Sequence, residues 1–307
     1  MLRRCLVLCL VVLFVLVPGS QALAKGSNAE RIRAELAGLH KQLMEVKSAA
    51  EAQLLQARMA VLIQELERDP EVQRNLAELK ARLDAKVKAK IAHDLANNDR
   101  LPWSTKTVGK PGPATGGAGS AVGTALLPEG ESVVVASTVR WDLLRRGDIM
   151  HVNNKKFFNL YALYYSHSGI YDGANLVYDS NVDGVRLRPL SDWQQGQPVA
   201  LGYNNRRTYS ERVAALDWAK ARYGTDGSTP YNWNFLDKQT DSALYCSQLV
   251  WKTNLHLGDD LDSNDPDYAW FLFIRYGLVG LAFAYYAVAP DEIYLSPLVT
   301  YYSVGTG

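Results

Sequence analysis

The spacing of apolar residues between Asn28 and Ala96 predicts helices that each bury one narrow stripe. Apolar residues recur there at steps of three and four, with a slip of register near Ala50. The first stripe consists of Ile32, Leu36, Leu39, Leu43 and Val46, and continues with Leu55, Met59, Leu62 and Leu66. Asp69-Pro70 then has the pattern of an N-cap and a first-turn proline, so a second helix begins there. Two helices of similar length predict an antiparallel hairpin or a kinked stalk over residues 25–97.

The same stripe has a second interpretation. A narrow apolar seam is also typical of coiled-coil-like association between copies of a chain, so self-association through this region is an alternative. His40 and His93 fall within it, and their positions predict ordinary side chains on its polar face.

A change of composition separates this region from the rest of the chain. Residues 98–132 contain Pro102, Pro111 and Pro113, a run rich in glycine over 116–120, and few large apolar residues. Such a segment is typical of a linker or a surface loop. A second domain is therefore expected over residues 133–307.

In the second domain the hydrophobic pattern changes to that of short strands and helices. Ser166–Tyr171 and Leu176–Ser180 flank a turn at Asp172-Gly173, which is the pattern of a β-hairpin. The other predicted elements are a strand over Val185–Leu190, a helix between the capping box at Thr208–Glu211 and Gly224, a helix from near Cys246 to before Gly258, and a last strand at Ile293–Leu295. Strands in hairpin order with a few helices predict an α+β domain on an antiparallel sheet.

A strongly apolar run extends from Ala269 to Ala289 and contains Arg275. A transmembrane span there would cut the domain from its predicted last strand. The run is therefore expected to be a buried segment, or an apolar wall for an acyl chain, with membrane contact left open.

Two loops carry unusual compositions. The acidic residues over 259–267 resemble a calcium loop only faintly, because the central glycine and the closing glutamate are missing, and they predict a solvated loop. The aromatic residues Tyr231, Trp233 and Phe235 fit the core or rim of the domain, or one wall of a cleft.

The N-terminus has the parts of a secretory signal peptide over residues 1–24. Arg3 and Arg4 precede an apolar run, Cys5–Val17, which is shorter than the roughly 20 residues of a membrane-spanning helix. Ala22-Leu23-Ala24 supplies the small residues of a cleavage site. The chain is therefore expected to be exported to the periplasm or cell envelope, with an uncleaved anchor as the alternative.

Charge and cysteine content limit the binding partners and the disulfides that we expect. The formal net charge of +1 indicates neither nucleic acid nor an anionic membrane surface as a partner. Of the three cysteines, two lie in the predicted signal peptide, so Cys246 is expected to be the only thiol after export. A protein exported with one thiol does not depend on disulfides for its stability.

The surroundings of Cys246 favour chemistry over a structural role. The residues after it predict a helix, whose first N–H groups would stabilise a thiolate and hold an oxyanion. A nucleophilic cysteine needs a base, and the mature chain has five histidines. His40 and His93 lie in the helical region, His256 lies about 15 Å away at the far end of the same helix, and His151 lies at a polar strand end. His167 remains as the candidate base.

Asp179 is the candidate for the group that orients the imidazole. In the predicted hairpin, His167 and Asp179 lie directly opposite each other on one face when the connecting loop has an odd number of residues, such as the five from Tyr171 to Asn175. An even loop would present Tyr178 or Ser180 instead.

Several short motifs together carry a resemblance. They are Leu144–Ile149 (LRRGDI), Ser166–Tyr171 (SHSGIY), Val177–Ser180 (VYDS), the loop at Pro230-Tyr231, Tyr245–Val250 (YCSQLV) and Ala289–Pro297 (APDEIYLSP). In this order they resemble the circularly permuted branch of the NlpC/P60 superfamily, the YiiX/YebB-like cysteine hydrolases with a papain-like core. Histidine precedes cysteine in that branch. The resemblance implies Cys246 as nucleophile, His167 as base and a third residue at Asp179, where related sequences often carry glutamate.

The expected function is that of an exported cysteine hydrolase that uses a thioester intermediate and needs no cofactor or metal. Its substrate is a peptide amide of the cell-wall layer or an acyl-lipid amide or ester, and acyl transfer is an alternative to hydrolysis. An alternative from a different functional class is a non-catalytic envelope adaptor whose helical region binds a partner.

Overall fold

The computed structural model describes residues 28–46, 48–98, 139–153 and 162–307. The predicted signal peptide, with Cys5 and Cys9, lies outside these residues, as does nearly all of the predicted linker over 98–132.

The N-terminal region contains three helices, where the hydrophobic pattern predicted two. They are α2 (Asn28–Met44), α3 (Ala49–Leu66) and α4 (Pro70–Asn97). The slip of register near Ala50 marks the break between α2 and α3. Ser48 is the N-cap of α3, and its hydroxyl accepts a hydrogen bond from the Glu51 N–H. The start predicted at Asp69-Pro70 is confirmed, because the Asp69 carboxylate accepts from two N–H groups of the first turn of α4.

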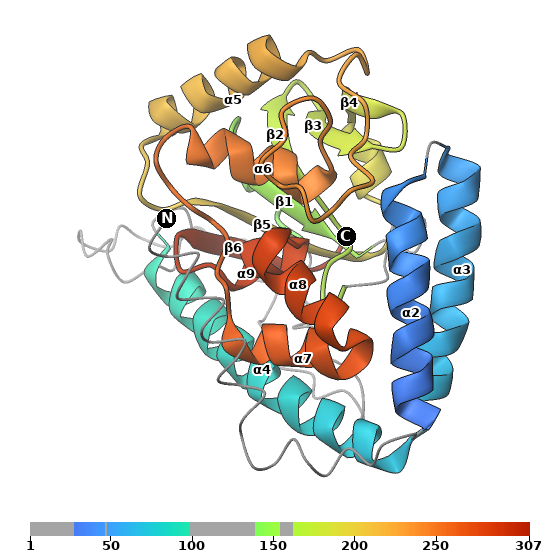
Figure 1. The fold of residues 1–307 in the computed structure, drawn as a ribbon. Helices are drawn as coiled ribbons and strands as arrows, with labels where there is room; N and C mark the ends of the chain where they lie inside the picture. The colour runs from blue at the N-terminus through green and yellow to red at the C-terminus, as the bar shows by residue number, and fades with distance from the viewer. Residues whose placement is uncertain (1–27, 47, 99–138, 154–161) are drawn as a thin grey trace.

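The predicted apolar seam is buried between helices of the same chain. Helices α2 and α3 lie side by side (Figure 1) and bury apolar residues of the stripe against each other. His40, expected on the polar face, is only 1% exposed, and burial lowers its pKa to about 4. His93 is exposed, as predicted. Self-association of the chain stays a prediction.

The helix α4 runs along the second domain instead of projecting from it as a stalk. It packs on α7 (Pro266–Tyr276) and on the last strand, β6 (Val299–Thr306). Asp94 accepts a hydrogen bond from the Tyr301 N–H at 3.1 Å. Lys86 pairs with Asp265 at 3.0 Å, so part of the acidic loop is tied to α4.

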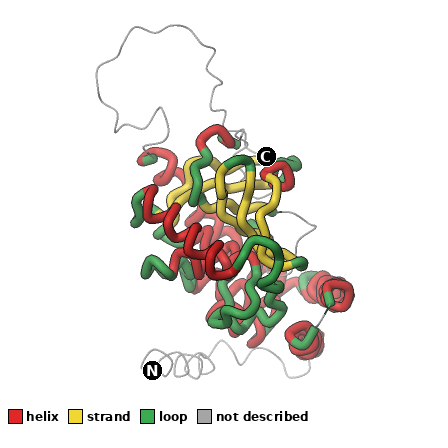
Figure 2. The backbone as a smooth tube through the Cα atoms, turned by 90° about the horizontal axis from the view of Figure 1, so that it is seen from above, coloured by secondary structure: helices red, strands yellow, loops and turns green. Residues whose placement is uncertain are grey.

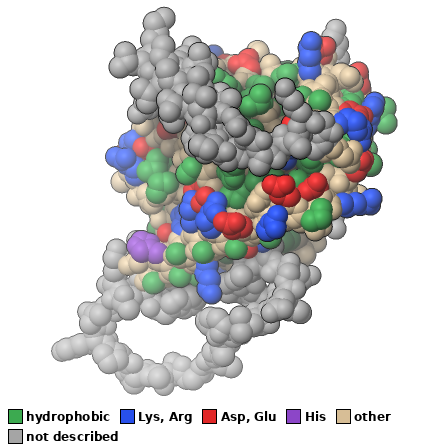
Figure 3. Space-filling model, turned by 60° about the horizontal axis from the view of Figure 1, so that its bottom comes forward, with side chains coloured by type: hydrophobic (Ala, Val, Ile, Leu, Met, Phe, Trp, Pro, Cys, Tyr) green, Lys and Arg blue, Asp and Glu red, His purple; other side chains and the backbone are tan. Residues whose placement is uncertain are grey.

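The rest of the acidic loop is also paired, and the prediction that it is solvated is wrong. Asp259 is buried against Arg207, and Asp262 is buried against Lys238. On the face of the molecule drawn in Figure 3, basic and acidic side chains lie interspersed. The acidic residues of this loop therefore act as ties between elements.

Among the described residues of the second domain, six strands form one antiparallel sheet at its centre. Its strands, in chain order, are β1 (Ile149–Val152), β2 (His167–Gly173), β3 (Leu176–Asn181), β4 (Gly184–Pro189), β5 (Pro198–Asn204) and β6 (Val299–Thr306). They are arranged in the order β4-β3-β2-β1-β5-β6, and Figure 2 shows them as one layer flanked by helices. The predicted α+β class is confirmed.

Among the α-helices described in this domain, α5 (Tyr209–Tyr223) and α6 (Cys246–Leu255) confirm predicted helices, α7 and α8 (Leu278–Tyr286) occupy the apolar run, and α9 (Pro290–Leu295) replaces a predicted strand. The strand predicted at Ile293–Leu295 is wrong, because Pro290 and Glu292 begin a helix there and the Glu292 carboxylate accepts from the Ala289 N–H at 2.7 Å. The last strand is β6.

The apolar run over 269–289 forms most of α7 and all of α8, which are separated by Gly277 at a φ of 64°. Among the described residues, no helix has both the length and the apolar character needed to cross a membrane. Much of the run is buried against its neighbours, as one of the two sequence interpretations expected.

The close crossing of α7 and α8 generates a stability prediction. A Cβ at Gly280 would lie 2.1 Å from the carbonyl oxygen of Leu272, which is backbone and cannot move aside cheaply. We expect Gly280→Ala to lower the free energy of unfolding in urea by about 1–3 kcal/mol. Gly38→Ala is the control, because nothing lies within 4 Å of that position in α2, and it should stabilise by about 0.5–1 kcal/mol. Equal stability of Gly280→Ala and wild type would contradict the crossing.

Candidate active site

Cys246 is the first residue of α6, as the sequence predicted. It is 6% exposed and is the only cysteine within the described ranges. The first turn of the helix is fixed by Gln248, whose side-chain oxygen accepts from the Tyr245 N–H at 3.1 Å and from the Asn232 amide at 3.0 Å. The backbone N–H groups of Ser168 and Ser247 both donate to the thiol. The sulfur therefore lies where backbone dipoles favour its thiolate form.

Gln248 was not predicted as a site residue. Its side-chain NH₂ group donates to the carbonyl oxygens of Lys238 and Thr240, both at 3.1 Å. It thereby ties the loop before α6 to the turn that carries Cys246. A glutamine two residues after the cysteine was visible in the motif Tyr245–Val250, but the motif alone does not show that its side chain points back to the loop.

His167 and Asp179 lie on one face of the β2–β3 hairpin, and their side chains meet. The distance from His167 Nε2 to Asp179 Oδ2 is 2.8 Å, and both residues are buried. The predicted direct opposition is wrong, because Gly169 is the residue paired with Asp179. The turn has two residues, Ala174 and Asn175, both with positive φ. A β-bulge at Asp172 adds the residue that restores a common face.

Arg188 completes this arrangement and was missed by the sequence reasoning. Its Nε lies 2.7 Å from Asp179 Oδ1, on the opposite side of the carboxylate from His167. The alternating pattern of its strand suggested a polar face in solvent, but the Arg188 side chain is only 15% exposed. Asp179 is therefore held between an imidazole and a guanidinium, with one partner at each carboxylate oxygen.

Trp193 fixes the other side of the imidazole. Its ring centroid lies 5.1 Å from that of His167. Trp193 is 2% exposed and also lies against Gly169, where an added Cβ would be 2.9 Å from the indole. The ring of His167 is thus packed as well as hydrogen-bonded, and it has little freedom to turn away from the thiol.

His151 is not at a polar strand end, as expected, but within β1 and fully buried. Its ring nitrogens are 2.8 Å from Ser168 Oγ and 2.9 Å from the Tyr301 hydroxyl. Burial, and then the neighbouring His167, lower its pKa to about 3, so the ring is neutral. His256 stacks on Trp218. Among the described histidines, only His167 lines the same cavity as Cys246.

Cys246 and His167 change each other's ionisation. Burial alone would raise the pKa of the thiol, but the facing imidazolium and the two backbone donors lower it below its ordinary value. Burial alone would lower the pKa of His167, but the charge of the facing thiolate and the hydrogen bond to Asp179 raise it to about 9. The two side chains are hydrogen-bonded, so the stable form of the pair is thiolate and imidazolium.

Asp291 holds the backbone that leads into the catalytic strand. Its carboxylate accepts from three consecutive N–H groups, those of Leu163, Tyr164 and Tyr165. Burial raises the pKa of Asp291 to about 7, although these three bonds oppose the shift. The residue lies in the motif Ala289–Pro297, just before the segment Ile293–Leu295 that was predicted as a strand.

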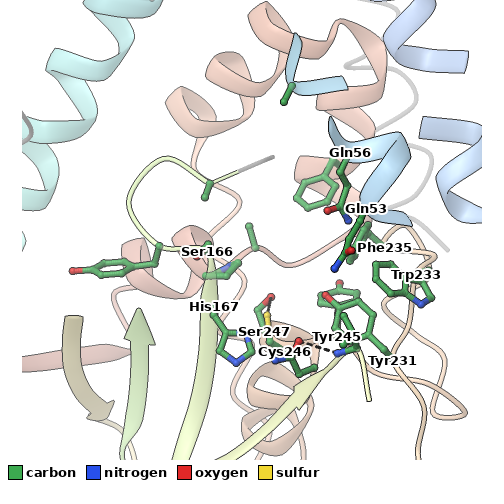
Figure 4. A pocket seen from close by; sticks show the side chains of 18 of the residues that line it. Gln53, Gln56, Ser166, His167, Tyr231, Trp233, Phe235, Tyr245, Cys246 and Ser247 are labelled. Atoms are coloured by element: carbon green, nitrogen blue, oxygen red, sulfur yellow. Dashed lines mark hydrogen bonds between the residues drawn. The ribbon is translucent and has the colours of Figure 1, made fainter. Parts of the chain in front are cut away.

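A cavity of about 620 Å³ opens above the thiol. Figure 4 shows Cys246 and His167 next to each other at its base, with Tyr231 and Trp233 at one side. The aromatic loop therefore lines a cleft, which was one of its two interpretations. The described residues contain no group of three or more His, Cys, Asp or Glu placed to hold a metal ion.

Comparison with known families was consistent with this geometry. Residues 143–263 match the family model described as permuted papain-like amidase enzyme, YaeF/YiiX, C92 family. This part of the chain is similar to that family. The matched segment contains His167, Asp179 and Cys246 in the permuted order. No curated protein and no solved structure matched the chain. The permuted papain-like domain is thus a cysteine hydrolase of amidase type, whereas a specific link to NlpC/P60 stays a prediction.

The ion pair predicts the pH dependence of alkylation at Cys246. In wild type the thiolate persists below the ordinary thiol pKa, so iodoacetamide should react readily at pH 7. In His167→Ala, no cation opposes the burial that raises the thiol pKa. The alkylation rate at pH 7 should then fall at least about 10-fold, because a rise of one unit in the thiol pKa lowers the thiolate fraction tenfold. The measurement is the rate of carbamidomethylation by intact mass across pH 5–10. Superimposable pH profiles for the two proteins would exclude the pair.

Proposed function

We propose that the protein hydrolyses an amide bond by nucleophilic catalysis at Cys246. The thiolate attacks the substrate carbonyl carbon, and the π electrons move to the carbonyl oxygen. His167 then gives its proton to the leaving nitrogen as the C–N bond breaks, which leaves a thioester. Water gives a proton to His167 as its oxygen attacks the thioester carbonyl carbon. The tetrahedral intermediate then re-forms the C=O bond, the C–S bond breaks, and the acid leaves, so that Cys246 is again a thiolate and His167 an imidazolium. The observation that supports this best is the imidazole held between the thiol and a buried carboxylate.

Asp179 and Arg188 have positioning roles in this proposal. Asp179 accepts from Nε2 of His167, which leaves Nδ1 as the nitrogen that exchanges a proton with the thiol. Arg188 keeps the carboxylate paired on its other oxygen, so that it does not take up the proton of the imidazolium.

The oxyanion would be stabilised by the start of α6. The N–H groups of the first turn have no partner within the helix and lie beside the sulfur. The Tyr231 hydroxyl is a further donor in the cavity, and burial, followed by the nearby thiolate, raises its pKa well above the ordinary value, so it keeps its proton.

For the substrate, we propose a peptide amide of the cell envelope. The signal-like N-terminus supports export to that compartment. The cavity walls combine aromatic, aliphatic and polar side chains, and the three glutamines among them can hydrogen-bond peptide groups but not a long alkyl chain. Four residues of the run over 269–289 line the cavity, namely Arg275, Phe283, Val288 and Ala289, and the rest of the run is not part of the lining. The acyl-lipid alternative therefore has less support.

Hydrolysis assays test the proposal. Purified peptidoglycan fragments and acylated lipids are incubated with wild type, Cys246→Ala and His167→Ala, and new amino groups are quantified. We expect release from peptide fragments by wild type, and a fall to background in both variants. Asp179→Asn should lower kcat about 10- to 1,000-fold, because the imidazole loses its orienting anion.

A quench with hydroxylamine adds a direct readout, because it converts a thioester at Cys246 to a hydroxamate. Activity that survives Cys246→Ala would overturn the mechanism. The adaptor alternative predicts no hydrolysis of either substrate and alkylation of Cys246 no faster than that of a free thiol.

A further inference from the structure

One wall of the catalytic cavity comes from α3, which lies outside the segment that matches the amidase family. Six of its residues line the cavity, and they recur at the spacing of one helix face: Gln53, Gln56, Ala57, Ala60, Ile63 and Gln64. Glu67, the residue that follows the helix, lines it as well. In Figure 4, Gln53 and Gln56 extend from this helix toward the space above Cys246. The N-terminal region therefore contributes to the site itself.

The two faces of α3 have different roles. One face carries Met59, Leu62 and Leu66, which are buried against α2 and account for the packing of the helix. The cavity face contains two alanines, Ile63 and three glutamines. In the described part of the chain, no hydrogen bond joins the side chains of Gln53, Gln56 or Gln64 to another residue. Their amide groups are thus available to a ligand, and the alanines between them leave room for it.

Contacts at the far end of the hairpin hold this wall in place. Glu67, the residue that follows α3, pairs with Arg275 of α7 at 2.8 Å. Arg33 of α2 donates to the carbonyl oxygen of Ile274 at 2.9 Å. Arg275 has a side-chain exposure of 16% and also lines the cavity. The hairpin is therefore fixed beside the cavity at one end by charged groups bonded to α7.

Glutamine amides favour one class of substrate. Each primary amide is uncharged and both donates and accepts hydrogen bonds. A backbone peptide group has the same properties. An alkyl chain against the same wall would strip water from the three amides and leave them unpaired, which is unfavourable. The aromatic rings of the lining, those of Tyr231, Trp233 and Phe235, do not discriminate in this way.

We propose that the cavity face of α3 is the specificity-determining wall, and that Gln53, Gln56 and Gln64 bind backbone amides of a peptide substrate. The proposal deepens the proposed function and rests on Cys246 being the reactive group. It also gives the N-terminal helices a role within the enzyme, in selection of substrates that carry several peptide bonds next to the scissile one.

The test uses two electrophiles that differ only in what the wall would recognise. One is a chloroacetyl-capped dialanine amide, and the other is a chloroacetyl alkylamide of the same length. The second-order rate of labelling at Cys246 is measured by intact mass on the full-length protein, and iodoacetamide serves as the reference for thiol reactivity. Variants are Gln53→Leu, Gln56→Leu and their combination. Gln42→Leu, an exposed glutamine of α2 outside the cavity lining, is the matched control.

We expect wild type and Gln42→Leu to prefer the peptide reagent. Each cavity variant should lower the rate with the peptide reagent about 3- to 10-fold, and the double variant about 10- to 100-fold. Rates with the alkylamide should stay the same or rise, and rates with iodoacetamide should not change. Those two controls exclude a general loss of structure.

Two results overturn the proposal. One is an absence of preference for the peptide reagent in wild type, including a failure to label with it. The other is an equal loss with both reagents in the cavity variants. The outcome is separate from that of the hydrolysis assay: if the preference holds but no amide is cleaved, the proposed reaction is wrong and the binding wall stands. If cleavage holds without the preference, only the wall is wrong.

Discussion

The structure of the site depends on one buried arrangement of charge, in which the His167 imidazole lies between the Cys246 thiol and the Asp179 carboxylate. Each member would be unfavourable in its ionised form if it were buried alone. Together with Arg188 they form an alternating row of charges, thiolate, imidazolium, carboxylate and guanidinium. Removal of any one leaves a neighbour buried without its partner, so the reactive state of the thiol is a property of the row.

Much of the surrounding fold serves to hold that row. The bulge in β2 sets the face that His167 and Asp179 share. Gln248 fixes the turn that carries Cys246, and Asp291 fixes the segment before His167 by three backbone bonds. Helix α4 packs along the domain, and α3 forms one side of the cavity above the sulfur. The N-terminal helices are therefore integrated with the catalytic domain.

The sequence was informative where a feature depends on local chemistry. A capping box and a glycine predicted both ends of α5, and the motif around Cys246 predicted the start of α6. It was less informative where a feature depends on what packs against a residue. The burial of His40 and of His151 is set by other elements.

The hairpin register shows the same limit. A one-residue bulge cannot be recognised from composition, yet it decides which residues meet. Arg188 and α9 were missed for related reasons. A polar position on an alternating strand does not reveal a buried carboxylate on the neighbouring strand, and three apolar residues do not distinguish a short helix from a strand. The contribution of α3 to the cavity needed the tertiary structure, because nothing in its amphipathic pattern indicates which surface its polar face meets.

The most direct test of the central claim is a titration of the Cys246 thiolate by its ultraviolet absorbance, taken as the difference between wild type and Cys246→Ala. We expect thiolate absorbance at neutral pH, with a midpoint below that of an unperturbed thiol, and an upward shift of that midpoint in Asp179→Asn. A wild-type midpoint at or above that of an unperturbed thiol would show that burial dominates, and it would contradict the ion pair on which the account depends.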